Sequence, residues 1–246
     1  MGASISPYAT LDETIVADAP KESDESAHVD PCNYERVEAC ISMILPMALA
    51  DRIDGAKILR AFDECTARWH QASAVPPLAD DFDTAIEALH LANFELWHQE
   101  DKARDIHSGD AGVAAAKRAI DAINQRRNDQ IERCDELLLK DLSAKKLPNP
   151  QAEQHSETAG MMLDRLSIMS LKMYHTREEI ERIPSPPGHR ERNLRRLATL
   201  EQQRGDLASC LDRLWQRVLH GELRFQVYRQ LKMYNDPDLN PVLYEK

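Results

Sequence analysis

The sequence predicts an all-α protein, an up-down antiparallel bundle of about five to six helices, four of them long. Of its 246 residues only 8 are glycine, and 5% are aromatic, whereas β-sandwiches and barrels use many turn glycines and β-branched strands. The 13 prolines fall in clusters. Because an interior proline costs a helix about 3 kcal/mol, the long stretches between these clusters are where long helices can form.

The elements follow in order along the chain. Residues 1–30 carry seven acids and one base, and they cannot bury enough apolar surface to offset their ordering entropy. We therefore expect a disordered acidic tail, followed by a single helical-bundle domain over residues 31–246. Two shorter helices are expected near 33–50 and 54–72. The proline-free stretches then predict long helices at about 80–106, 110–146, 151–182 and 189–234.

Charge and hydropathy limit the classes of function. The net charge of -11 opposes binding to a phosphate backbone, so we expect no nucleic-acid partner. The mean hydropathy of -0.55 leaves no room for a membrane span, so no membrane partner is expected either. Five scattered cysteines and the lack of a secretory signal predict a cytoplasmic protein. No motif identifies a cofactor.

Polar and charged side chains stand at positions where a plain bundle would place leucine. Helical stepping puts the following residues in or beside apolar seams: Asp101 and Arg104; Asn124, Arg127 and Asn128; Glu157 and Asp164; and Arg204. An unpaired buried charge costs several kcal/mol, so these groups need partners or a ligand. They form either a structural ion-pair network that fixes helix register or a polar pocket inside the bundle. Periodicity alone does not decide between the two.

His98 and Asp101 are the candidate catalytic pair. They lie three residues apart on the helix expected at 80–106, a spacing that suits one divalent metal or a general acid/base pair. A partly exposed histidine paired along its own helix is an equally good interpretation. Glu87 and His90, like Glu95 and His98, form an E-x-x-H motif. A di-iron bundle needs this motif on two different helices, and here both copies lie on the helix expected at 80–106.

Four stretches of sequence resemble a known family when they are read together. They are LWHQEDKAR at 96–104, IDAINQRRND at 120–129, ETAGMMLDRLSI at 157–168 and KMYNDPDLNP at 232–241. In this order they resemble the bacterial family named domain of unknown function 4254. The resemblance implies a cytoplasmic helical protein and transfers no activity. The four stretches include several of the charged residues in the apolar seams. This overlap favours a polar pocket over a structural ion-pair network.

Two functions from different classes remain open. The first is a binder or enzyme for an anionic small molecule, such as a phosphorylated sugar or nucleotide-sugar, in which His98 and Asp101 transfer protons or hold a metal. Its ligand-binding residues would be Arg104, Asn124, Arg127, Asn128, Glu157, Asp164 and Arg165. The second is a non-catalytic module that forms a homodimer or docks a partner, with the internal charges as a structural ion-pair network.

Overall fold

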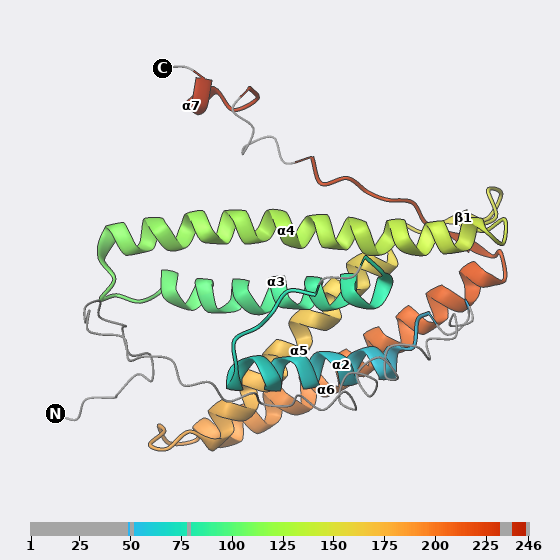
Figure 1. Cartoon of the computed structure of the whole chain (residues 1–246). Coiled ribbons are helices and arrows are strands. Elements are labelled where there is room, and N and C mark those ends of the chain that lie inside the picture. The colour runs from blue at the N-terminus through green and yellow to red at the C-terminus, as the bar shows by residue number, and fades with distance from the viewer. Residues whose placement is uncertain (1–48, 50–51, 78–79, 232–237, 245–246) are drawn as a thin grey trace, which may run out of the picture. The chain divides into compact units, whose positions relative to one another are not determined.

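The computed structural model describes residues 49, 52–77, 80–231 and 238–244. Its main elements are the helices α2 (Gly55–Gln71), α3 (Phe82–Ala103), α4 (Gly109–Ser143), α5 (Ala159–Glu181) and α6 (His189–Leu219) (Figure 1). Two short strands, β1 (Glu153–Gln154) and β2 (Leu223–Arg224), and a short helix α7 (Pro241–Tyr244) complete it. The expected all-α class is confirmed. The acidic tail and the helix expected near 33–50 lie outside the described residues.

Two helix boundaries differ from the prediction, and local backbone chemistry explains both. The helix expected at 151–182 begins only at Ala159, because Thr158 is its N-cap and accepts a hydrogen bond from the Met161 amide. The helix expected at 189–234 ends at Leu219, and Gly221 follows with a φ of 73° that a helix cannot adopt. The residues before α5 and those after α6 pair with each other, since β1 and β2 form a parallel two-stranded sheet.

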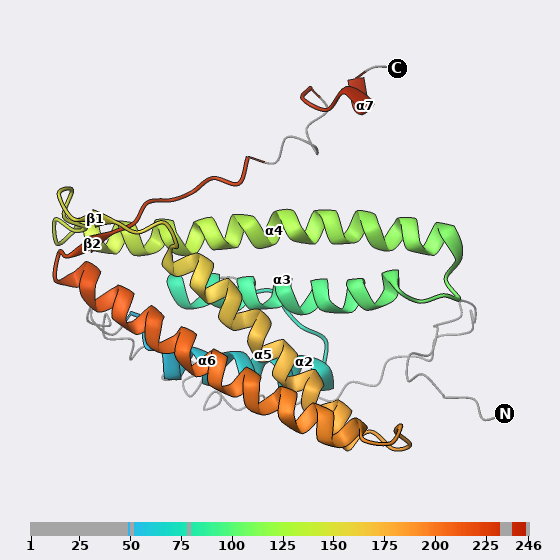
Figure 2. The same cartoon turned by 180° about the vertical axis from the view of Figure 1, so that it is seen from behind.

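The long helices form two hairpins. α3 and α4 run antiparallel side by side, and α5 and α6 form the second hairpin, which crosses the first at a steep angle (Figures 1 and 2). α2 packs against α5 and α6. No helix in the described part of the chain is both long and apolar enough to cross a membrane.

Two apolar clusters hold these helices together. The larger one takes side chains from all five long elements, including Phe62, Leu89, Leu138, Leu163 and Trp215. The smaller one contains four buried residues, Trp69, Leu91, Phe94 and Leu171, and it joins α2, α3 and α5. This second cluster lies directly beside the histidines described below, because Phe94 contacts two of their rings.

The backbone of α5 lies very close to α4 at Gly160. A Cβ atom at this position would lie 2.4 Å from the Ile131 carbonyl oxygen and 3.0 Å from Asp135 Oδ1. The Gly160 amide donates a 2.7 Å hydrogen bond to that same carboxylate. Burial raises the pKa of Asp135 to about 6, although the hydrogen bonds from Thr158 and Gly160 oppose the shift. Only glycine fits this crossing.

Gly160→Ala is therefore expected to destabilise the protein by at least about 3 kcal/mol, because backbone atoms on α4 would have to move. Gly205→Ala is the matched control, since a Cβ on this α6 residue would meet nothing within 4 Å. It should stabilise the helix by about 0.5–1 kcal/mol. Urea denaturation of both variants measures the effects, and equal changes at the two positions would contradict the role given to the crossing.

Candidate functional site

Arg127 and Asp164 form a two-point ion pair between α4 and α5. Arg127 Nε donates to Asp164 Oδ1 at 2.7 Å, and Nη2 donates to Oδ2. The Asp164 side chain is only 7% exposed, and the Arg127 side chain is 23% exposed. Hydrogen bonding to Asp164 raises the pKa of Arg127, so the guanidinium remains charged. For these two residues the geometry is that of an internal structural pair.

This ion pair continues into a buried chain of hydrogen bonds. Asn93 donates both to Asp164 Oδ1 and to Ser167 Oγ, at 2.9 and 3.0 Å. Ser167 Oγ lies 2.8 Å from His90 Nδ1, while His90 Nε2 lies 3.0 Å from the Phe62 carbonyl. Because a carbonyl only accepts, Nε2 carries the proton and Nδ1 accepts from Ser167. The chain thus joins α4, α5, α3 and α2.

Other predicted site residues lie at the surface and do not converge with this pair. Arg104 donates to Glu100, one turn back on its own helix, and its side chain is 69% exposed. Asp101 is also exposed, so the expectation that these two residues face the interior is wrong. The seam pattern misleads here because α3 ends at Ala103, beyond the reach of the core. Arg165 is exposed and donates to Glu157.

The two asparagines on α4 differ in burial. Asn128 is buried, and its Nδ2 has no hydrogen-bond partner among the described residues. Asn124 is half-buried. The three arginines predicted to hold one anion therefore have separate carboxylate partners: Glu100 for Arg104, Asp164 for Arg127 and Glu157 for Arg165. The structure does not bring these three side chains together at one site.

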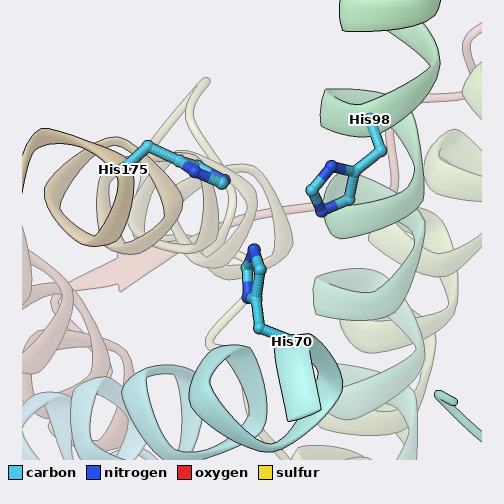
Figure 3. A group of neighbouring side chains, drawn as sticks. All are labelled: His70, His98 and His175. Atoms are coloured by element: carbon cyan, nitrogen blue, oxygen red, sulfur yellow. The ribbon is translucent and has the colours of Figure 1, made fainter. Parts of the chain in front are cut away.

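Three histidines from three helices converge on one point. His70 lies in the last turn of α2, His98 on α3 and His175 on α5, and their rings turn toward a common centre (Figure 3). One ring nitrogen from each lies within 4.8 Å of the other two. Of the predicted catalytic pair, His98 belongs to this cluster, while the Asp101 carboxylate does not.

Hydrogen bonds fix which nitrogen of two rings faces the centre. His70 Nδ1 lies 2.8 Å from the Thr66 carbonyl oxygen, and His175 Nδ1 lies 2.7 Å from Glu178 Oε2. Both partners only accept, so each Nδ1 carries a proton, and in the neutral form of each ring Nε2 has a free lone pair. These two Nε2 atoms are buried and have no hydrogen-bond partner among the described residues. Two lone pairs turned toward each other repel unless a cation lies between them.

The third ring is kept neutral by its surroundings. Burial lowers the pKa of His98, and the neighbouring His70 and His175 lower it further, while Asp101 and Glu178 oppose the shift. A neutral imidazole is the form that coordinates a metal ion. In its neutral form each of the three rings can therefore present a lone pair to the same point.

Aromatic side chains surround the three rings. Tyr174 stacks on His70 with centroids 4.2 Å apart, and Trp97 stacks on His175 at 4.6 Å and 8°. Phe94 meets His98 edge-on at 4.6 Å. This apolar shell limits the motion of the rings and lowers the local dielectric constant, which strengthens any coordination there.

The sequence patterns single out His98 but assign no site role to His70 or His175. One signal was available, because each of the three helices in question carries a histidine near one end of an apolar face. The positions of these histidines predict a cluster only when the crossing angle of the two hairpins is known. That angle decides whether the three helix ends meet.

The Arg127–Asp164 pair yields a stability prediction. Arg127→Met should lower the free energy of unfolding by about 3 kcal/mol, because it leaves the buried Asp164 charge without its ionic partner. Arg165→Met removes the same kind of group from an exposed pair and should cost less than about 1 kcal/mol. Chemical denaturation of both variants provides the comparison, and a larger loss for Arg165→Met would refute this assignment.

The buried His90 predicts a pH dependence. Burial lowers its pKa from 6.5 to about 3, so below pH 6.5 the unfolded chain takes up a proton that the folded protein does not. The free energy of unfolding should fall by ~2 kcal/mol from this group between pH 7 and 5. The raised pKa of Asp135 changes the free energy of unfolding in the opposite direction as the pH falls. This contribution cancels when wild type is compared with His90→Gln, because both proteins contain Asp135. The stability advantage of wild type over the variant should therefore shrink by that amount in urea titrations at the two pH values.

Comparison with known proteins places this fold in a family. No curated protein and no solved structure matches the chain. The family model described as Protein of unknown function (DUF4254) matches residues 83–227, more than half of the chain. The match covers α3 to α6 almost completely and includes His98 and His175, while His70 precedes it. The chain therefore belongs to the DUF4254 family.

Proposed function

We propose that this protein binds one divalent transition-metal ion through His70, His98 and His175, and that the ion serves a small-molecule site. The observation that carries the proposal is the pair of buried Nε2 atoms on His70 and His175 that face the cluster without partners. A polar atom of this kind normally has a hydrogen bond. A metal ion at the centre would satisfy both lone pairs at once.

The donor set suits zinc and its neighbours in the first transition series. Imidazole nitrogen is a ligand for Zn²⁺, Cu²⁺, Ni²⁺ and Fe²⁺, whereas Ca²⁺ and Mg²⁺ prefer oxygen. In a tetrahedral zinc site with bonds of about 2.0–2.1 Å, ligand nitrogens lie roughly 3.3 Å apart. The three nitrogens here lie within 4.8 Å of each other, so small rotations of the rings would complete the site.

The hydrogen bonds behind the rings match those of known metal centres. A metal-bound histidine usually donates its second N–H to a carbonyl or carboxylate, which fixes the tautomer and raises the basicity of the ligand. The Thr66 carbonyl serves His70 in this way, and Glu178 serves His175.

Three protein ligands leave a coordination position for another group. Zinc sites with three ligands and an open position are the catalytic kind, whereas structural sites take four protein ligands. The fourth position would receive solvent or a group of the small molecule. This arrangement supports a metal-dependent binder or enzyme acting on a small anionic molecule, since an anion is the natural fourth ligand of a cation held by neutral imidazoles.

The first test of the metal site is zinc binding by the full-length protein in competition with a chromophoric chelator. Wild type should bind one equivalent. His70→Gln and His175→Gln should each weaken binding at least 100-fold, because each removes one of three ligands. His107→Gln changes an exposed histidine outside the cluster and should leave the affinity unchanged. Equal affinities for wild type and the two cluster variants would refute the proposal.

Glu178 should act as a positioning residue. Glu178→Gln removes the carboxylate that holds His175 Nδ1 and should weaken zinc binding about tenfold, as substitutions behind metal ligands commonly do. Glu181→Gln is the control, because Glu181 lies on the same helix and is exposed. The same competition assay reads both variants. A tenfold loss in the control as well would indicate a general charge effect.

A further inference from the structure

A hollow of about 470 Å³ adjoins the histidine cluster. It lies between α3, α5 and α6, and His175 belongs to its lining as well as to the cluster. A small molecule seated in this hollow would contact the ring of a metal ligand.

The two basic side chains of this hollow have no acidic partner. Lys172 on α5 and Arg196 on α6 both line it, and neither forms an ion pair with any residue that the structure describes. Among the described residues Arg196 has one side-chain hydrogen bond, from Nη1 to Asn193 Oδ1, which leaves most of its guanidinium donors without a partner there. The acid in the lining, Glu179, is held by Arg182 at 3.0 Å and by His189 at 2.8 Å.

These two side chains differ from the arginines of the sequence-predicted anion site. The chain carries a net charge of -11, and the arginines of the sequence-predicted anion site each have a carboxylate partner. The remaining wall of the hollow is apolar: Trp97 and Leu200 form it, beside the largely buried Thr176. The hollow therefore combines two available cations with an aromatic surface.

We propose that this hollow binds the phosphate group of a small phosphate ester and packs the organic part of that ester against Trp97 and Leu200. The inference deepens the proposed function and rests on it for the role of the metal. Phosphate fits better than a carboxylate for two reasons. Its two negative charges match two cations on different helices, and its tetrahedral oxygens can reach both of them at once. An apolar wall favours an ester with a ring over inorganic phosphate.

Metal and phosphate ester should bind cooperatively. A cation held by His175 adds positive charge at the edge of the hollow, so an anion there is more stable when the metal is present. Because coupling between two sites is reciprocal, the ester should strengthen metal binding by the same factor.

The test measures binding of phenyl phosphate by calorimetry to full-length protein that has been loaded with one equivalent of zinc and desalted. The double variant Lys172→Gln/Arg196→Gln should raise the Kd at least tenfold. Lys140→Gln/Arg195→Gln changes the net charge equally, at exposed positions outside the hollow, and should leave the Kd within twofold of wild type. Phenyl phosphate should bind more tightly than inorganic phosphate, and acetate more weakly than either.

Equal Kd values for the two double variants, or no binding of phenyl phosphate by wild type, would overturn the inference. Zinc affinity is measured on the same proteins, and it should not fall in Lys172→Gln/Arg196→Gln if the centre and the fold are intact, because the variant removes two positive charges near the metal. If wild type takes up no zinc, the proposed metal function fails by itself. Titration of the metal-free protein with phenyl phosphate then still tests the hollow. The Kd values of the two double variants should again differ tenfold.

Discussion

The contact between α4 and α5 at Gly160 is the constraint on which the rest of the structure depends. A backbone amide donates to a buried carboxylate there, in a space that leaves no room for a side chain. This contact sets where α5 starts across the first hairpin. One turn later Asp164 meets Arg127, and about three turns further on His175 faces His98. The crossing therefore helps to set the geometry of the histidine cluster, because the distances from His175 to the other two rings depend on how α5 is placed.

The buried polar chain from Arg127 to the Phe62 carbonyl preserves that placement. Each of its members has a specific partner on another helix, so a shift of α5 by one residue would leave Asp164 charged and unpaired in the interior. Apolar packing alone would tolerate several registers of two leucine-rich helices. We therefore interpret this chain as the device that selects one register, with a modest net effect on stability.

The class of fold and most helix positions could be predicted from proline spacing and apolar periodicity, because both act locally. The ends of α5 and α6 could not, since Thr158 and Gly221 act through cap and backbone geometry that a proline-free stretch does not reveal. For the site, helical stepping correctly brought Arg127 and Asp164 into the interior, but it also placed Arg104 there, although it is exposed. Helical stepping predicts which face of a helix turns toward the interior. It does not predict how far the neighbouring helix extends along that face. The cluster of His70, His98 and His175 depends on three helices meeting, which is a tertiary property.

The position of His70 in the last turn of α2 has an electrostatic consequence. The carbonyl groups at the end of a helix are directed outward and give it a partial negative charge, equivalent to about half an electron. The end of α2 therefore attracts a cation before any ring coordinates it, over a distance of about one turn. The Thr66 carbonyl that holds His70 Nδ1 belongs to the same helix end, so one backbone segment both orients the ligand and lowers the electrostatic potential around it.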